Sequence, residues 1–74
     1  MSGFLTEEEF HKRFAEGVRR IRTEYGDTQL GLDKGIKNNS NLTNQIEGLR
    51  MYPSLYTAYR IITYYGLDLK DFIK

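Results

Sequence analysis

The chain has 74 residues, no cysteine, one proline, and eleven basic against ten acidic side chains, which gives a formal net charge of +1. The lack of cysteine excludes a disulfide-stapled fold, thiolate metal sites and thiol catalysis, and the single histidine, His11, cannot form a histidine cluster. Leu, Ile, Val and Phe make up about a quarter of the residues, so we expect one domain over residues 1–74 that folds on its own apolar core.

A long helix is predicted first, over about residues 6–25. Thr6, followed three residues later by Glu9, is typical of a capping box at a helix start. One apolar stripe then recurs at helical spacing, and it consists of Phe10, Phe14, Val18, Ile21 and Tyr25. Gly26 is expected to end this helix. His11 follows an apolar position on a charged helix and is expected to be solvated.

Two shorter helices are predicted next, separated by the polar run 37–41. The first begins after Asp27-Thr28, which offers a cap. The second is expected over about residues 40–49, because its apolar residues recur at spacings of four and three, namely Leu42, Ile46 and Leu49. Either Asn39 or Ser40 is expected to cap it.

Two last helices are predicted over about residues 54–73. Pro53-Ser54 is a typical helix start and Gly66 a typical helix end. The stripe expected to face the core between them consists of Leu55, Ala58, Tyr59, Ile62 and Tyr65. Asp68 is expected to cap the final turns. Because no segment shows the sustained two-residue alternation of a strand, the predicted fold class is all-α with five helices.

Several short motifs follow one another at fixed spacing along residues 21–72. They are Ile21-Arg22 followed by Thr28-Gln29, the apolar pair Leu32 and Ile36, then Ile46-Glu47, Pro53-Ser54-Leu55 and Gly66-Leu67-Asp68-Leu69. In this order they resemble the phage repressor and Cro type of helix-turn-helix domain, also called the XRE family. The resemblance implies a compact five-helix domain in which helices 2 and 3, over about residues 28–50, form the helix-turn-helix. It also implies that Arg22 and Glu47 pair and brace the fold.

Three residues depart from the family's pattern. Asp33 stands where the family usually has alanine, and Thr43 stands where it usually has an apolar residue. Lys37 stands where it usually has the glycine of the turn, so Lys37-Asn38-Asn39 must build this turn. An asparagine is the candidate for the left-handed conformation there.

The resemblance implies a DNA-binding surface, because the second helix of a helix-turn-helix enters the major groove and its N-terminal residues touch base edges. The candidates for DNA contact are Gln29, Lys37, Ser40, Asn41, Asn44 and Gln45. Asn and Gln bind adenine through N6 and N7 at once, so the operator half-sites would contain A·T pairs. Helix capping needs the same residue types, and for residues 38–41 it is an equal alternative.

The leading interpretation is a sequence-specific DNA-binding regulator of phage or bacterial transcription that binds a two-fold, double-stranded operator as a homodimer. No pattern of catalytic residues is present, and neither a cofactor nor a metal is expected. No apolar run is long enough to cross a bilayer, and the N-terminus lacks a signal-peptide pattern. We therefore expect a cytoplasmic protein without a membrane partner.

The charge balance favours a second interpretation. Phosphate contacts by Lys and Arg supply much of the affinity of DNA-binding proteins, and the net charge is only +1. The recognition segment offers three cations for such contacts, Lys34, Lys37 and Arg50, which predicts modest affinity and a shallow salt slope. A helix-turn-helix modulator or antirepressor that binds a partner repressor protein is the alternative. The tyrosines of the last third outnumber the inward positions of one helix, which indicates an exposed surface for self-association or a partner: Tyr52, Tyr56, Tyr59, Tyr64 and Tyr65.

Overall fold

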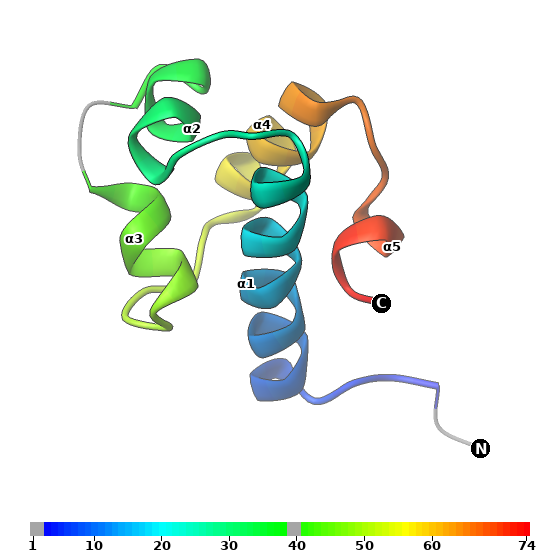
Figure 1. Cartoon of the computed structure of the whole chain (residues 1–74). Helices are drawn as coiled ribbons and strands as arrows, with labels where there is room; N and C mark the ends of the chain where they lie inside the picture. Colours follow the sequence, from blue (N-terminus) through cyan, green and yellow to red (C-terminus); the bar gives the residue numbers. More distant parts are fainter. Residues whose placement is uncertain (1–2, 39–40) are drawn as a thin grey trace.

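The computed structural model describes residues 3–38 and 41–74 (Figure 1). These residues form five α-helices and no strand, which confirms the predicted all-α fold. The helices are α1 (Glu7–Glu24), α2 (Gln29–Gly35), α3 (Leu42–Glu47), α4 (Leu55–Tyr65) and α5 (Leu69–Phe72). No helix among the described residues has the length and apolar character needed to span a membrane.

Helix α1 forms the centre of the fold, with α2 and α3 on one side and α5 on the other (Figure 1). The predicted capping box is confirmed: the Glu9 amide donates to Thr6 Oγ1, and the Thr6 amide donates to Glu9 Oε1, both at 3.1 Å. Gly26, with φ of 75°, ends the helix as predicted. Only part of the predicted stripe is in the core, since Tyr25 at the end of α1 is 56% exposed.

The core is one cluster to which all five helices contribute. Its most deeply buried side chains are Phe14, Val18, Leu32, Ile46, Ile61 and Phe72, none of them more than 1% exposed. Burial of this apolar surface is the main favourable free energy of folding. Because α1, α2 and α3 all pack on the same cluster, their relative positions are fixed by it.

The turn after α2 takes a conformation that glycine usually provides. Lys37 has a φ of 60°, in the left-handed region, where an asparagine was the expected residue. The Lys37 amide donates to the carbonyl of Lys34 at 3.0 Å, and the Asn38 amide donates to the carbonyl of Asp33 at 2.8 Å. This pair of bonds is a Schellman end, which satisfies two of the last carbonyls of the helix.

Helix α3 is shorter than the predicted 40–49, and its cap differs from the prediction. Asn41 occupies the cap position without a side-chain hydrogen bond to the helix. The cap comes from α2, where the Oδ1 atom of Asp33 accepts a hydrogen bond of 2.9 Å from the Thr43 amide. Asn39 and Ser40, the residues expected to cap α3, lie outside the described residues.

Helix α4 begins after Ser54, whose Oγ accepts from the Thr57 amide at 3.1 Å. The predicted core stripe is confirmed in part: Tyr65 is buried, and Ala58 and Ile62 pack against the core. Two of its residues do not face the core. Leu55 is 89% exposed and Tyr59 is 59% exposed. The buried residues are Thr57, Ile61 and Tyr65, which recur every four residues. The Ser54 hydroxyl also donates to Thr57 Oγ1 at 3.1 Å, so this threonine can be buried with its oxygen bonded, which a pattern of apolar residues does not reveal.

His11 is packed rather than solvated, which corrects the expectation from its charged neighbours. Its ring stacks on that of Tyr52, with centroids 3.8 Å apart and planes 9° apart, and its side chain is 12% exposed. The contact joins α1 to the segment before α4. One tyrosine of the predicted exposed set is therefore half covered by the histidine.

Candidate functional site

The pair of Arg22 in α1 and Glu47 in α3 joins the two helices. Arg22 Nε donates to Glu47 Oε2 at 2.8 Å, and Arg22 Nη2 donates to Glu47 Oε1 at 3.1 Å. The side chains are 13% and 7% exposed. The hydrogen bond to Glu47 raises the pKa of Arg22 above its ordinary value. The structure thus brings together the two residues expected to brace the fold, in the two-pronged geometry that is the strongest for this pair of groups.

Gln29, the first residue of α2, lies between this pair and α3. Its Nε2 donates to Glu47 Oε1 at 3.0 Å, and its Oε1 accepts from Asn44 Nδ2 at 3.2 Å. The Asn44 Oδ1 atom in turn accepts from Arg50, which follows α3. We call the five connected residues the polar chain: Arg22, Glu47, Gln29, Asn44 and Arg50. It fixes the rotamers of two predicted DNA contacts, Gln29 and Asn44, before any ligand binds.

The polar chain lines a depression of about 280 Å³, which Arg19 and Gly48 complete. Three guanidinium groups surround one carboxylate there, and that carboxylate is already paired with Arg22. Arg19 and Arg50 are both exposed. The depression therefore has an excess of positive charge and of N–H donors, which suits an anion such as a phosphate of a nucleic-acid backbone.

Two further predicted contacts are exposed, namely Gln45 on α3 and Asn41 at the cap position, four residues earlier in the chain. Side chains four apart on a helix lie on the same face. Asn44 is adjacent to Gln45 along the chain and half-buried beneath the same surface. Uncharged amide side chains therefore occupy the outer side of α3, next to the arginine-lined depression.

The remaining predicted contacts are not part of this group. Lys37 is exposed at the end of α2 and lines other depressions, not the one that contains Gln29 and Asn44. Ser40 lies outside the described residues. The structure therefore brings Gln29, Asn41, Asn44 and Gln45 to one side of the α2–α3 unit and places Lys37 at its other end.

Arg19 of this depression was missed as a contact by the sequence reading, whereas Arg50 was expected as one of the few cations near the recognition helix. Arg19 precedes Arg22 by three residues, so helical spacing alone was a signal that both lie on the same side of α1. The place of Arg50 in the depression was not predictable, because it depends on how the chain turns after α3. Leu49 makes that turn with a φ of 57°, a conformation that the sequence did not indicate for a leucine.

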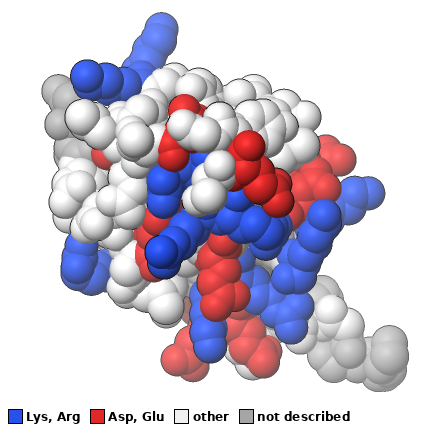
Figure 2. Space-filling view, viewed as in Figure 1, with Lys and Arg blue, Asp and Glu red and all other residues white. Residues whose placement is uncertain are grey.

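No family model, curated protein or solved structure matches this chain. What the site binds must therefore be inferred from its own chemistry. Figure 2 shows Lys and Arg side chains intermingled with Asp and Glu over the face that α1 crosses. The face seen in this view is therefore of mixed charge rather than basic.

Proposed function

We propose that this protein is a sequence-specific DNA-binding regulator of transcription, of phage or bacterial type, that works in the cytoplasm without catalysis or a cofactor. In this proposal α2 and α3 are a helix-turn-helix, and α3 enters the major groove. The observation that carries it is the bonded set of Gln29 and Asn44 beside exposed Asn41 and Gln45. Amides held in place can make paired hydrogen bonds to adenine, so A·T pairs are the expected target.

The proposed backbone contacts are Arg19 and Arg50, which flank the amides on the same depression. Each neutralised phosphate contributes about −0.9 to the slope of log affinity against log salt. These two contacts would give a slope of about −2, which is shallow for a DNA-binding protein. A net charge of +1 for the whole chain fits such weak, mainly local electrostatic attraction.

Fluorescence anisotropy with A·T-rich and G·C-rich duplexes, at low and moderate salt, tests the proposal. Gln45→Ala and Asn41→Ala should lower affinity for the A·T-rich duplex by about 1–3 kcal/mol each and reduce the preference for it. Thr23→Ala, an exposed uncharged position on α1, is the control and should bind as the parent chain does. No measurable binding of either duplex at low salt would rule out the DNA-binding proposal.

A second candidate function is a helix-turn-helix modulator or antirepressor that binds a partner repressor protein. The mixed-charge face over α1 favours it, because such a surface attracts nucleic acid weakly but can pair with a protein of complementary charge pattern (Figure 2). Size-exclusion chromatography with the repressor encoded beside the gene tests this function. A complex without any DNA binding by this chain would support it, and separate elution of the two proteins would contradict it.

A further inference from the structure

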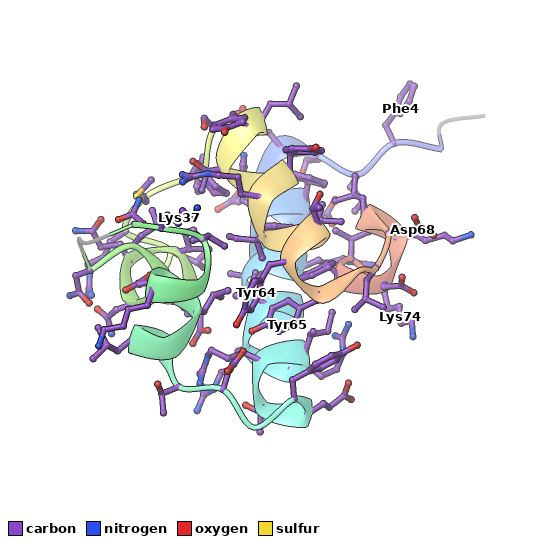
Figure 3. All side chains as sticks on the ribbon, turned by 90° about the horizontal axis from the view of Figure 1, so that it is seen from above. Phe4, Lys37, Tyr64, Tyr65, Asp68 and Lys74 are labelled. Atoms are coloured by element: carbon purple, nitrogen blue, oxygen red, sulfur yellow. The ribbon has the colours of Figure 1, made fainter. Side chains whose placement is uncertain are left out.

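A shallow groove of about 260 Å³ lies between α4 and the end of α2. Its lining is mainly apolar and includes Ile36 and the rings of Tyr59 and Tyr64. Figure 3 shows Lys37 at the end of α2 next to α4, and Tyr64 projecting from α4 toward α2. Gly35 allows this close approach, because a Cβ there would be 2.5 Å from the Tyr64 ring. The packing of α2 against α4 thus forms the groove.

Two cations, Lys37 and Arg60, also line the groove. Neutral oxygen atoms hold Arg60 in place: its Nη1 donates to the Ile36 carbonyl at 2.9 Å, and its Nη2 donates to Thr57 Oγ1 at 3.4 Å. Because Ile36 directly precedes Lys37, the first bond brings the guanidinium to the turn that carries this lysine. Neither cation forms an ion pair with another described residue. The chain therefore leaves both positive charges available to an acidic group from outside.

The excess of positive charge continues beyond the groove. Lys37 also lines a neighbouring depression of about 400 Å³, together with Leu30 and Lys34. The described residues that line these two hollows include three cations and no aspartate or glutamate. The one acid of α2, Asp33, is buried and bonded to Thr43. In a chain with a net charge of only +1, this part of the surface combines local positive charge with an apolar groove.

We propose that this groove binds an acidic segment of another protein. An apolar side chain of the segment lies against Tyr59 and Tyr64, and its carboxylates pair with Lys37 and Arg60. Because Arg60 is already held by its own chain, little side-chain entropy is lost when it binds a carboxylate. The groove shares no lining residue with the arginine-lined depression, so this proposal goes beyond the proposed DNA binding and does not rest on it.

The ring contacts of the tyrosines favour a protein segment over a nucleic acid. Single-stranded nucleic acids bind tyrosines beside cations by stacking bases on the rings. Here the chain itself supplies stacking partners, since Arg60 lies over the Tyr56 ring, 5.1 Å from its centroid, and the Tyr56 and Tyr59 rings stack with centroids 6.2 Å apart. Duplex DNA presents phosphates, sugars and base edges. A peptide supplies an apolar side chain and carboxylates together, which matches the groove and its two cations.

A nuclear magnetic resonance titration of the isotope-labelled chain, without DNA, tests the proposal, because it detects weak binding and identifies the residues contacted. The probe is a short peptide of alternating glutamate and leucine. It should shift the amide signals of Gly35, Lys37 and Thr63, with a dissociation constant of about 0.1–1 mM, since the groove is small. Two control peptides, one with lysine for glutamate and one with serine for leucine, should each bind at least about tenfold more weakly.

Lys37→Asn tests the charge of the groove. Asparagine tolerates the left-handed conformation of this position, so the turn should survive. Loss of one exposed cation should weaken binding of the acidic peptide about threefold. Lys12→Gln, at an exposed position of α1, removes the same charge away from the groove and is the matched control. It should bind the peptide as the parent chain does.

Thr63→Glu tests the groove itself. Thr63 is exposed on α4, and a glutamate there places a carboxylate among the cations and fills part of the space for the peptide. This variant should bind the acidic peptide at least about tenfold more weakly, and the dispersion of its own spectrum reports that it is folded. Thr23→Glu, at an exposed position of α1, adds the same charge elsewhere and is the control.

Four outcomes would each overturn the proposal. They are equal binding of the glutamate and lysine peptides, signal shifts confined to residues outside the groove, unchanged binding by a folded Thr63→Glu, and tighter binding of a single-stranded oligothymidylate than of the acidic peptide at the same amides. The last result would assign the groove to a nucleic acid instead. Because the peptide titrations contain no DNA, failure of the proposed DNA binding would leave their outcome unchanged.

Discussion

Thr43 donates two hydrogen bonds to one carboxylate oxygen of Asp33. Its backbone amide lies 2.9 Å and its hydroxyl oxygen 2.6 Å from Asp33 Oδ1. Both residues are buried, at 0% and 3% exposure. The pair therefore joins α2 to α3, because the buried carboxylate of Asp33 in α2 accepts from both the amide and the hydroxyl of Thr43 in α3.

This coupling predicts how the two residues behave in a double-mutant cycle. Asp33→Ala should destabilise the fold by about 3 kcal/mol, because it leaves the buried amide and hydroxyl of Thr43 without an acceptor. Thr43→Val should cost less once Asp33 is alanine, by at least about 1 kcal/mol. Urea unfolding of the parent, both single variants and the double variant measures the coupling. Strictly additive effects would show that the two side chains do not act together.

Two residues other than glycine adopt the left-handed backbone conformation, and replacing them by glycine should stabilise the fold. Lys37 and Leu49 have φ of 60° and 57°, a conformation that costs a residue with a Cβ about 1–2 kcal/mol. Lys37→Gly and Leu49→Gly should each raise the free energy of unfolding by about 1 kcal/mol. The control is Gly26→Ala at the end of α1, where φ is 75° and the loss should be of similar size. Destabilisation by both glycine variants would contradict this account.

The residues that the sequence predicted well are those whose structure depends on near neighbours. Thr6 and Glu9 bind each other three residues apart, so their spacing in the chain is enough to predict the cap. The start of α3 was not predictable in that way, because its cap, Asp33, is ten residues from Thr43 and belongs to another helix. Local patterns carry no information about such a partner.

In the candidate site, too, single residues were predictable but the contacts between helices were not. Gln29, Asn41, Asn44 and Gln45 were proposed from their residue types and from the helix-turn-helix positions that the resemblance implies. The links between them were not predictable, since the Gln29 to Asn44 bond requires α2 and α3 to pack at a given distance. The exposure of Leu55 was not predictable either. On α4 the buried residue is Thr57, whose hydroxyl oxygen is bonded to Ser54, while the apolar Leu55 faces solvent.

Tyr65 predicts a pH dependence of stability on the alkaline side. Burial, and then its hydrogen bond of 2.9 Å to Asp27 Oδ2, raises its pKa above the ordinary value. The folded state holds the phenol proton more tightly than the unfolded state. The protonated Tyr65 therefore contributes its full stabilisation of the fold below about pH 10, and this contribution is lost as the pH rises further. Tyr65→Phe should flatten the fall in unfolding free energy above about pH 10.

Chemical unfolding at a series of pH values from about 8 to 11 measures this slope, which for one proton reaches about 1.4 kcal/mol per pH unit. Tyr59→Phe, on the exposed side of α4, is the matched control and should keep the parental slope. An unchanged slope in Tyr65→Phe would exclude this tyrosine as the source of alkaline instability.

Gly17 lies where α1 and α5 are in close contact, so a larger residue there should destabilise the fold. A Cβ at this position of α1 would lie 1.9 Å from the Phe72 carbonyl oxygen, and Phe72 is fully buried in α5. Gly17→Ala must therefore move α5 away from α1. We expect it to lower the free energy of unfolding by about 2 kcal/mol, although alanine has the higher helix propensity. Thermal unfolding measures it, with Glu16→Ala at the adjacent exposed position as the control. An alanine variant as stable as the control would show that α5 can shift freely.

Under the proposed DNA-binding function, Arg19 contacts the phosphate backbone and Asn44 contacts bases, so variants of the two residues should change different properties of binding. Arg19→Ala should weaken binding to every duplex by a similar factor and make the salt slope shallower by about 1, because one phosphate contact is lost. Asn44→Ala should lower affinity by about 1–3 kcal/mol for the preferred duplex and relax base preference. It should change the salt slope less than Arg19→Ala does, because Asn44 carries no charge and acts on the phosphate contact only through its bond to Arg50. The bond of Asn44 to Gln29 predicts that Gln29→Ala reproduces part of the Asn44 effect.

Anisotropy titrations at several salt concentrations, on matched A·T-rich and G·C-rich duplexes, give both the slope and the preference for each variant. Arg22 is left intact in all of them, because its pair with Glu47 holds α1 and α3 together and its loss would confound binding with folding. If Arg19→Ala changes base preference while Asn44→Ala changes the salt slope, the assignment of the two residues is reversed. If neither variant changes binding, the depression between α1, α2 and α3 does not face the DNA.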